Sequence, residues 1–250
     1  MDITLVIPAA GRGSRLLDQA TQIPKGMVPV GGAPLLQYVL DAGLELPISR
    51  IAIVINHKGD LIKQYFGYSY RQTPIHYVVQ PEPLGIAHAV SMAEFLVKEW
   101  FVVINGDELF TNCRHAGIKK FIEQKGADGV VGYLHTSEPQ RIQIGYGMTL
   151  TKDRRVERLI EKPPAPWNDI LGVGTWMHRL DFFEYFRRTP NHPVRNERDF
   201  VSVIQLMIDD GQRMFGFDLR GEFFNINRRE DLEKAEAALR RQVAIFDMAG

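Results

Sequence analysis

A glycine-containing segment with several cationic side chains follows the first apolar run of the chain. It reads Pro8-Ala9-Ala10-Gly11-Arg12-Gly13-Ser14-Arg15-Leu16, and Pro24-Lys25 follows nearby. Small residues allow the backbone to approach a ligand closely, and successive N–H groups of a tight turn can bind phosphate oxygens. Between residues 8 and 26, three cations (Arg12, Arg15 and Lys25) outweigh the single Asp18, which leaves a formal charge of +2. The segment is therefore a candidate polyphosphate site.

Two common phosphate-binding motifs do not fit this segment. Leu16 stands where a dinucleotide fingerprint has its third glycine, and the Gly-x-x-x-x-Gly-Lys-Ser/Thr pattern occurs nowhere in the chain. An ordinary surface turn with solvated arginines is the alternative interpretation, and the spacing of Arg15 and Pro24-Lys25 weakens it.

Asp107 is the second candidate, because it follows an apolar run and the flexible pair Asn105-Gly106. A lone carboxylate at the carboxyl end of a strand can hold Mg²⁺, which completes its shell with water and phosphate oxygens. A capping role for Asp107 is the alternative.

Further polar residues also stand at the ends of expected strands. Gln80 offers the donor and the acceptor that reading a base edge requires, and Lys162 could bind a phosphate while Glu161 accepts bonds from sugar hydroxyls. An exposed ion pair is the alternative for Glu161 and Lys162. Asn225 could complete a metal site with Asp107, whereas Asn227, with Glu230 three residues later, is expected to cap the last helix.

These residues depend on strands that alternate with helices along the first half of the chain. Continuous apolar runs predict strands at 3–7, 50–56, 75–79 and 101–104, with helices from Pro34, through Ile62 and Phe66, and over 85–97. The second half predicts strands without intervening helices at 129–135, 147–151 and 156–161. Helices follow near 181–186 and 200–208, with strands near 214–218 and 223–226. Such alternation is typical of a mostly parallel sheet covered on both faces, whose carboxyl edge would gather the candidates.

Composition narrows the class of protein. The chain has 250 residues, with 30 basic against 30 acidic side chains, so no net field draws it to nucleic acid or to a membrane. The single cysteine, Cys113, excludes an intramolecular disulfide, and neither a signal peptide nor an apolar run of membrane-spanning length is seen. We therefore expect a cytoplasmic protein with one domain.

Taken together, these motifs resemble the sugar-1-phosphate nucleotidylyltransferases, including glucose-1-phosphate uridylyl- and thymidylyltransferases. The resemblance spans roughly residues 3–232 and is strongest over 7–30. Supporting motifs lie at 80–89, Asn105-Gly106-Asp107, Tyr146-Gly147, Glu161-Lys162-Pro163 and Gly172-Val173-Gly174. It implies an α/β fold, a Rossmann-like three-layer α/β/α arrangement with a mixed, mostly parallel central sheet. It also implies a nucleotide-binding part at about 1–110, a sugar-phosphate-binding part at about 111–227 and a C-terminal helix at 228–246.

The resemblance also implies roles for individual residues. Those assigned to catalysis are Arg15, Lys25, Asp107 and Lys162. Those assigned to the nucleotide are Ala10, Gly11, Arg12, Gly13, Gln80 and Gly85, and those assigned to the sugar phosphate are Gly147, Glu161, Lys162 and Gly174. Asp107 and Asn225 are the expected Mg²⁺ ligands, although family members usually have an aspartate at the second position.

The implied reaction joins a nucleoside triphosphate, with UTP or dTTP favoured, to a sugar 1-phosphate and releases pyrophosphate. The sugar-phosphate oxygen is already anionic, so positioning and charge stabilisation suffice for catalysis. Two alternatives stay open: a guanylyl- or cytidylyltransferase acting on a different phosphorylated acceptor, and a catalytically silent sugar-nucleotide sensor on the same fold. The sugar is not specified by the sequence, and a homo-oligomer is left open.

Overall fold

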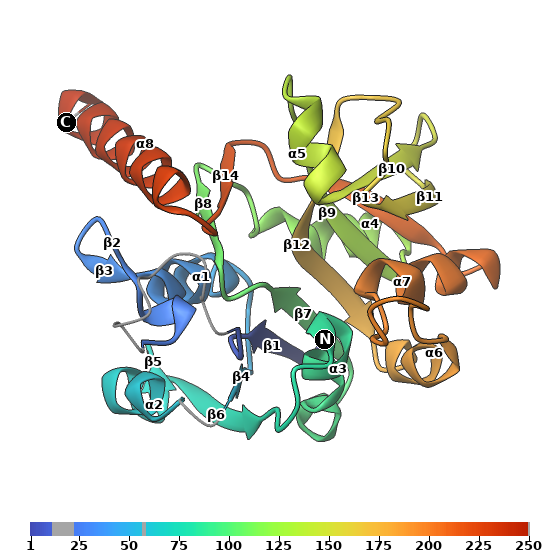
Figure 1. Ribbon diagram of the computed structural model, residues 1–250, viewed down its shortest axis with the longest axis horizontal. Helices are drawn as coiled ribbons and strands as arrows, with labels where there is room; N and C mark the ends of the chain where they lie inside the picture. Colours follow the sequence, from blue (N-terminus) through green and yellow to red (C-terminus); the bar gives the residue numbers. More distant parts are fainter. Residues whose placement is uncertain (12–22, 57–58, 250) are drawn as a thin grey trace.

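The computed structural model describes residues 1–11, 23–56 and 59–249, with only the backbone of 243–249. Its centre is a parallel arrangement of β7 (Trp100–Ile104), β1 (Ile3–Pro8), β4 (Arg50–Ile55) and β6 (Thr73–Val79), paired in that order. Figure 1 shows these strands side by side, with the N-terminus among them. All four end at the same edge, as expected for parallel strands joined by helical crossovers.

Strand alternation divides the apolar residues of these strands between the two faces of the sheet. In β1, Leu5 and Ile7 belong to one buried cluster and Val6 to another. In β7, Val102 and Val103 divide in the same way. Both faces of the sheet are therefore buried away from solvent, which explains why these strands are continuous apolar runs in the sequence.

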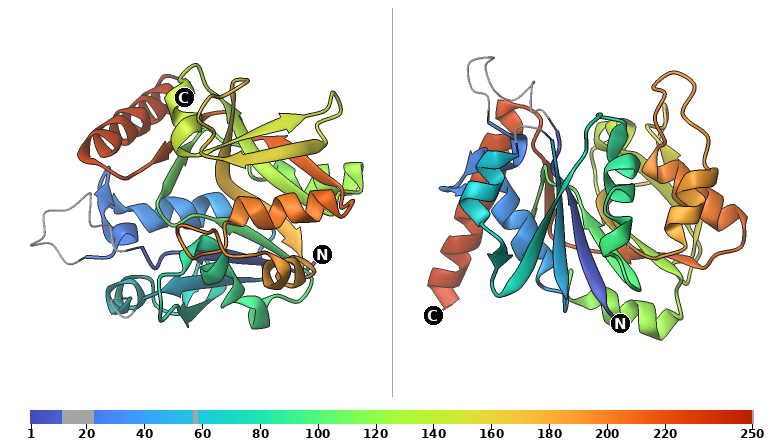
Figure 2. Two further views of the ribbon diagram at one scale, coloured as in Figure 1. Left: turned by 45° about the vertical axis from the view of Figure 1, so that its right-hand side comes forward. Right: turned by 90° about the horizontal axis from the view of Figure 1, so that it is seen from below.

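Helices cover both faces and complete three layers, which Figure 2 shows in its right-hand view. One face packs against α1 (Leu35–Gly43), α2 (Asp60–Phe66) and α4 (Gly117–Lys125). The other packs against α3 (Gly85–Ser91), α6 (Phe182–Arg188) and α7 (Phe200–Asp209). The predicted fold class, α/β with a mixed sheet, is confirmed.

The second half extends the sheet through antiparallel strands. Strand β12 (Ile170–Arg179) pairs with β7 and is flanked by β9 (Gly129–His135) and β10 (Tyr146–Leu150). Beyond these lie β13 (Met214–Asp218) and β11 (Val156–Glu161). The expectation of no helix between the strands at 129–161 is wrong, because α5 (Pro139–Ile144) lies between β9 and β10. The single helix expected over 85–97 is also wrong, since α3 ends at Ser91 and a 3-10 helix, η2 (Glu94–Leu96), follows it.

A smaller unit brings the end of the chain against the first half. Strand β14 (Glu222–Asn225) pairs with β8 (Glu108–Thr111), and the hairpin of β2 (Pro29–Val30) and β3 (Ala33–Pro34) lies beside them. The last helix, α8 (Arg229–Ala249), packs through Ala235 against the cluster of Val30, Leu35 and Leu109. Its far end projects from the body at the upper left of Figure 1. A short strand, β5 (Ser69–Tyr70), borders β6, and η1 (Lys25–Met27) is a 3-10 helix.

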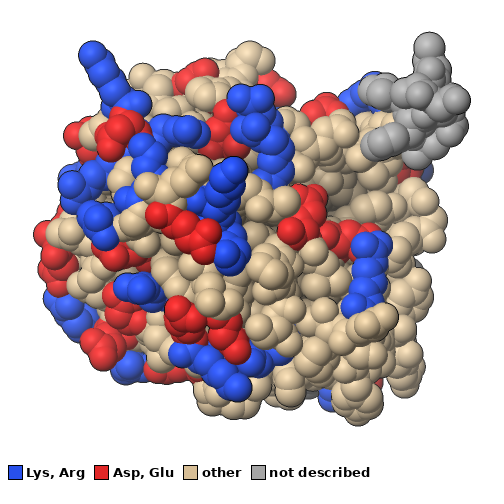
Figure 3. All heavy atoms as spheres, turned by 180° about the vertical axis from the view of Figure 1, so that it is seen from behind, with Lys and Arg blue, Asp and Glu red and all other residues tan. Residues whose placement is uncertain are grey.

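The surface carries charges of both signs. Figure 3 shows basic and acidic side chains side by side over the face opposite to that of Figure 1. Within the described residues, no helix is long and apolar enough to span a bilayer. The only cysteine, Cys113, lies beside β14, and its Sγ is 2.8 Å from the carbonyl oxygen of Arg220.

Candidate active site

The carboxyl ends of the parallel strands bring separate loops into backbone contact. The N–H of Ala9 donates to Val54 O at 2.8 Å, and the N–H of Gly106 donates to Pro8 O at 3.1 Å. The Gln80 N–H donates to Ile55 O at 2.8 Å. The loops after β1, β6 and β7 therefore form one connected edge, which is where ligands bind in open α/β sheets.

Close backbone approach at this edge requires a glycine at position 106. A Cβ built on Gly106 would lie 2.8 Å from Pro8 O and 3.2 Å from the Ala9 Cα. The loop after β1 is held from another side by Asn56, whose Nδ2 donates to Ala10 O at 2.8 Å. Sequence reasoning did not single out Asn56, although it is the last residue of the strand predicted at 50–56.

Lys25, Asp107 and Asn227 meet at the centre of the edge. The Lys25 Nζ lies 2.7 Å from Asp107 Oδ2 and 2.8 Å from Asn227 Oδ1. Lys25 is 9% exposed, and it comes from η1, whose backbone follows Pro24. Asp107 is reached through the Gly106 turn, and the N–H of Ile226 donates to Asp107 O at 3.0 Å, so pairing of the backbone brings the end of the chain to this point.

The two asparagines contact each other, and Asn227 does not form the cap expected of it. The capping box with Glu230 is wrong, because Asp231 Oδ2 accepts the N–H of Asn227 at 2.9 Å and that of Arg228 at 2.8 Å. The Asn227 side chain instead joins Lys25 and donates through Nδ2 to Asn225 Oδ1 at 2.7 Å. The structure thus places Asn227, and not Asn225, in contact with Lys25.

The two side-chain oxygens that contact Lys25 are also of the kind that bind a hard divalent cation. A carboxylate oxygen and an amide oxygen converge on one positive group, which is the ligand chemistry that Mg²⁺ takes from a protein when phosphates and water supply the rest. Side chains alone do not form a closed cage here, since the described ranges contain no group of three or more His, Cys, Asp or Glu residues placed to hold a metal. The site therefore suits a cation shared with an anionic ligand.

A pocket opens beside this cluster. Its walls include the backbone of the loops after β1 and β7, the apolar Pro83, Ile86 and Ala89, and the predicted residues Ala10, Gly11, Lys25, Gln80, Gly85 and Asp107. Gly85 has φ +85°, a left-handed conformation that favours glycine. A Cβ at Gly85 would also lie 2.8 Å from Oε2 of Glu197, a wall residue that sequence reasoning missed.

A buried carboxylate links the pocket to the second half of the chain. Glu108 accepts the N–H of Gly174 with both oxygens, at 3.2 and 3.0 Å, and accepts from Asn105 Nδ2 at 3.0 Å. Burial, with a smaller contribution from Asp107, raises the pKa of Glu108 to about 8. A Cβ on Gly174 would overlap both Asn105 and Glu108, so glycine is required there. The predicted Gly174 therefore acts on the pocket through Asn105, which lines it.

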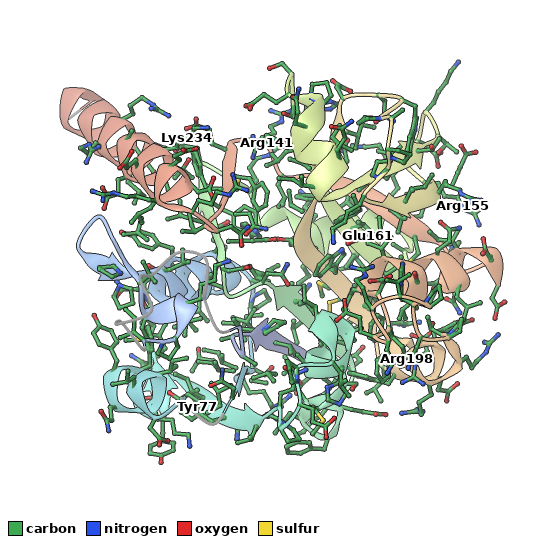
Figure 4. All side chains as sticks on the ribbon, viewed as in Figure 1. Tyr77, Arg141, Arg155, Glu161, Arg198 and Lys234 are labelled. Carbon is green, nitrogen blue, oxygen red and sulfur yellow. The ribbon has the colours of Figure 1, made fainter. Side chains whose placement is uncertain are left out.

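Glu161, Lys162 and Gly147 lie on the second half, outside the lining of this pocket. Glu161 is labelled in Figure 4 close to α7. Its Oε1 is 3.4 Å from Lys162 Nζ and 3.7 Å from Arg195 Nη1, and burial raises the pKa of its carboxyl. Lys162 has φ +47°, an uncommon value for a residue with a Cβ, and Gly147 pairs with Ile160 in the neighbouring strand. Arg195 was not predicted, because its segment carries no motif in the sequence.

Three predicted residues, Arg12, Gly13 and Arg15, lie outside the described residues.

Comparisons with known proteins find matches over most of the chain. The family model described as "Nucleotidyl transferase" matches residues 4–242. A UTP–glucose-1-phosphate uridylyltransferase of Haloferax volcanii is 30% identical over 241 residues, covering 95% of this chain and 96% of that protein. A UTP–glucose-1-phosphate uridylyltransferase of Bacillus subtilis is 27% identical over 255 residues, covering 90% of this chain and 86% of that protein.

Solved structures are similar at lower identity. A UDP-glucose pyrophosphorylase complexed with UDP-glucose superposes with a TM-score of 0.86 at 21% identity, covering 97% of this chain and all of that one (100%). A glucose-1-phosphate thymidylyltransferase structure from Bacillus anthracis has a TM-score of 0.83 at 21% identity, covering 94% of each chain. These structures share the fold.

Proposed function

The chain belongs to the nucleotidyl transferase family, and from this premise we propose that it joins UTP or dTTP to a sugar 1-phosphate, with release of pyrophosphate. The single observation that carries the proposal is the contact of Lys25 with Asp107 and Asn227 at the edge of the pocket. A cation held between two oxygen ligands, next to the glycine-containing loop after β1, is suited to a triphosphate and its counter-ion. The names of the relatives support the choice of substrates.

We assign the nucleotide to the first half, about residues 1–110. Ala10 and Gly11 would hold the triphosphate through their backbone, and Gln80 and Gly85 would contact the base, since all four line the pocket. Lys25 would move its charge to the phosphates when they arrive. Arg12, Gly13 and Arg15 retain their proposed roles from the resemblance.

We assign the sugar phosphate to residues of about 111–227. Lys162 and Arg195 are the cations of this region that lie near Glu161, and we propose that they bind the phosphate while Glu161 accepts bonds from sugar hydroxyls. Gly147 and Gly174 retain the sugar-phosphate roles that the resemblance implies, and Gly174 would act through its close contacts with Asn105 and Glu108. The last helix, in a single domain, then fixes Asn227 through its first turn.

For the metal, we propose Asp107 and Asn227 as the protein ligands of Mg²⁺, with Asn225 supporting Asn227. When bound, the ion supplies positive charge that offsets the phosphate oxygens. The chain's own residues hold the acceptor oxygen in line with the α-phosphorus. A bond then forms from that oxygen to the α-phosphorus while the bond to the bridging oxygen breaks, and pyrophosphate leaves with the electron pair.

The test is pyrophosphate release from UTP, dTTP, CTP, GTP and ATP, each with a panel of sugar 1-phosphates and with Mg²⁺ present or chelated. We expect turnover with UTP or dTTP that chelation abolishes. Preference for GTP would indicate a guanylyltransferase. No release with any pair, alongside measurable binding of a nucleotide sugar, would indicate a silent sensor. We further propose a cytoplasmic location, and the oligomeric state can be measured on the same preparation.

A further inference from the structure

The amide group of Gln80 is held in one orientation by two acceptors. Its Nε2 lies 3.2 Å from Gly85 O and 2.9 Å from the Nδ1 of His88. A carbonyl oxygen only accepts, so the atom facing Gly85 must be the nitrogen of the amide. Both hydrogens of this nitrogen are then used, provided that the His88 Nδ1 carries no proton.

The surroundings of His88 favour that neutral ring. Burial lowers the pKa of His88; Arg198 lowers it further, while Glu82 raises it. Arg198 comes from the segment before α7 and is labelled in Figure 4. His88 lies one turn after Gly85 on α3, so the two acceptors share a helix face. Ala87 and Val90, both fully buried, fix that helix against the sheet.

The other end of the Gln80 amide is left for a ligand. Gln80 is 5% exposed and lines the pocket, and its Oε1 makes no hydrogen bond with any residue that the structure describes. Gln80 therefore presents an acceptor to the pocket and no donor. Uracil and thymine carry an N–H at ring position 3, whereas cytosine carries a bare acceptor nitrogen there.

We propose that His88 is a positioning residue for base selection: it fixes the Gln80 amide so that Oε1 accepts the ring N3–H of uracil or thymine and repels cytosine. The inference rests on the proposed function and specifies how its nucleotide site chooses a base. Without the ring acceptor, only the contact with Gly85 O at 3.2 Å opposes rotation, so the amide rotates by half a turn more readily. It then presents its NH₂ group to the pocket, which suits the cytosine ring nitrogen.

The experiment compares His88→Leu with His88→Asn, since the asparagine amide oxygen can accept near the place of Nδ1. The ratio of kcat/KM for UTP to that for CTP is measured with one sugar 1-phosphate, and Tm is recorded for each variant. We expect the ratio to fall about tenfold or more in His88→Leu, as expected for one misoriented hydrogen-bonding group, and to stay within about threefold of wild type in His88→Asn. An unchanged ratio in a folded His88→Leu protein would overturn the proposal.

A second measurement needs no unstable variant. In wild type the ratio should fall in acid, at a pH lower than the ordinary imidazole pKa because the pKa of His88 is lowered, since a protonated Nδ1 can only donate. UTP and CTP carry the same triphosphate, so its own titration cancels in the ratio. Glu82 and Arg198 are the charged groups facing the ring, and Glu82→Gln should shift the fall to lower pH. His88→Asn should show no such fall, and an equal fall in both proteins would contradict the role of His88.

Equilibrium binding separates this inference from the proposed function. If wild type shows no turnover with any nucleotide, the proposed function fails, yet titration calorimetry with UTP and CTP still measures base selection. If wild type is active with UTP but His88→Leu retains its selectivity, only the inference about His88 fails.

Discussion

The ammonium group of Lys25 lies 2.7 Å from a carboxylate oxygen of Asp107, although 82 residues separate the two in the chain. The side chains of this pair are 11% and 34% exposed, so water reaches the carboxylate more than the lysine. Lys25 occupies the point between Asp107 and Asn227 that we assign to the metal. A metal and a triphosphate arriving together would therefore release Lys25 toward the phosphates.

Neutralising either partner should abolish most turnover and leave the protein folded. We expect Lys25→Ala and Asp107→Ala each to lower kcat by about 10²-fold or more, because each removes charge stabilisation at the transferring phosphate. Lys119→Ala is the matched control, since Lys119 forms an exposed ion pair with Glu123. Near-normal rates in either pocket variant, measured by pyrophosphate release, would contradict the assignment.

The two asparagines should differ in their effect on metal dependence. Asn227→Ala should raise the Mg²⁺ concentration for half-maximal rate by about tenfold, since a first ligand is lost, whereas Asn225→Ala removes only a support and should raise it less. Asn227→Asp should keep the Mg²⁺ concentration for half-maximal rate at or below that of wild type, because a carboxylate is a stronger ligand than an amide. Mn²⁺ binding followed by electron paramagnetic resonance checks the order without turnover. The reverse order would favour Asn225.

Glu108 should make the protein less stable as the pH rises through the neutral range. Its folded pKa is about 8 against an ordinary value of 4.5, so the folded state keeps a proton that the unfolded chain releases. The contribution of Glu108 to the free energy of unfolding is fully present below about pH 4.5 and is lost as the pH rises toward 8. Glu108→Gln removes this loss, and its Tm should change less than that of wild type between pH 5 and pH 8. An identical change in both proteins would count against a protonated Glu108.

His178 should have the opposite effect in acid. Burial lowers its pKa to about 3 from 6.5, and neither ring nitrogen finds a partner among the described residues. The unfolded chain binds the proton first, so stability is lost as the pH falls from about 6.5 toward 3.

The ring of His178 stacks on Phe182, so His178→Phe keeps the shape of the site. Between pH 7 and pH 5, the Tm of His178→Phe should drop less than the Tm of wild type. The difference between the two drops should be about 2–4 °C. His76→Gln, at an exposed position, is the control and should follow wild type.

The strands that form the edge of the site were predictable because their physical cause is local. Runs such as 101–104 are apolar on both sides of the chain, since both faces of the sheet are covered. Strand β12 was missed because Gly172 and Gly174 interrupt its pattern, and both are required by close neighbours rather than by strand propensity. Helix α5 was missed because it is six residues long and buries only Ile142.

The site was predictable as a set of strand ends and less so as a set of contacts. Lys25 and Asp107 were both singled out, and the structure brings them together. Asn227 was assigned to a cap because the sequence offers a local partner, while its observed partner Lys25 is 202 residues away. Glu108 resembles any polar residue after a strand, and only the packing of β12 against it reveals that it is buried.

The place of Cys113 makes the chain convenient for labelling. Burial raises the pKa of its thiol to about 12, and the Sγ is held against the Arg220 carbonyl. Thiolate is the form that attacks maleimides, so this side chain should be nearly inert at neutral pH. A cysteine introduced at an exposed position of α8, such as Arg240, would then be the only reactive thiol, and a fluorophore there could report on the helix that anchors Asn227.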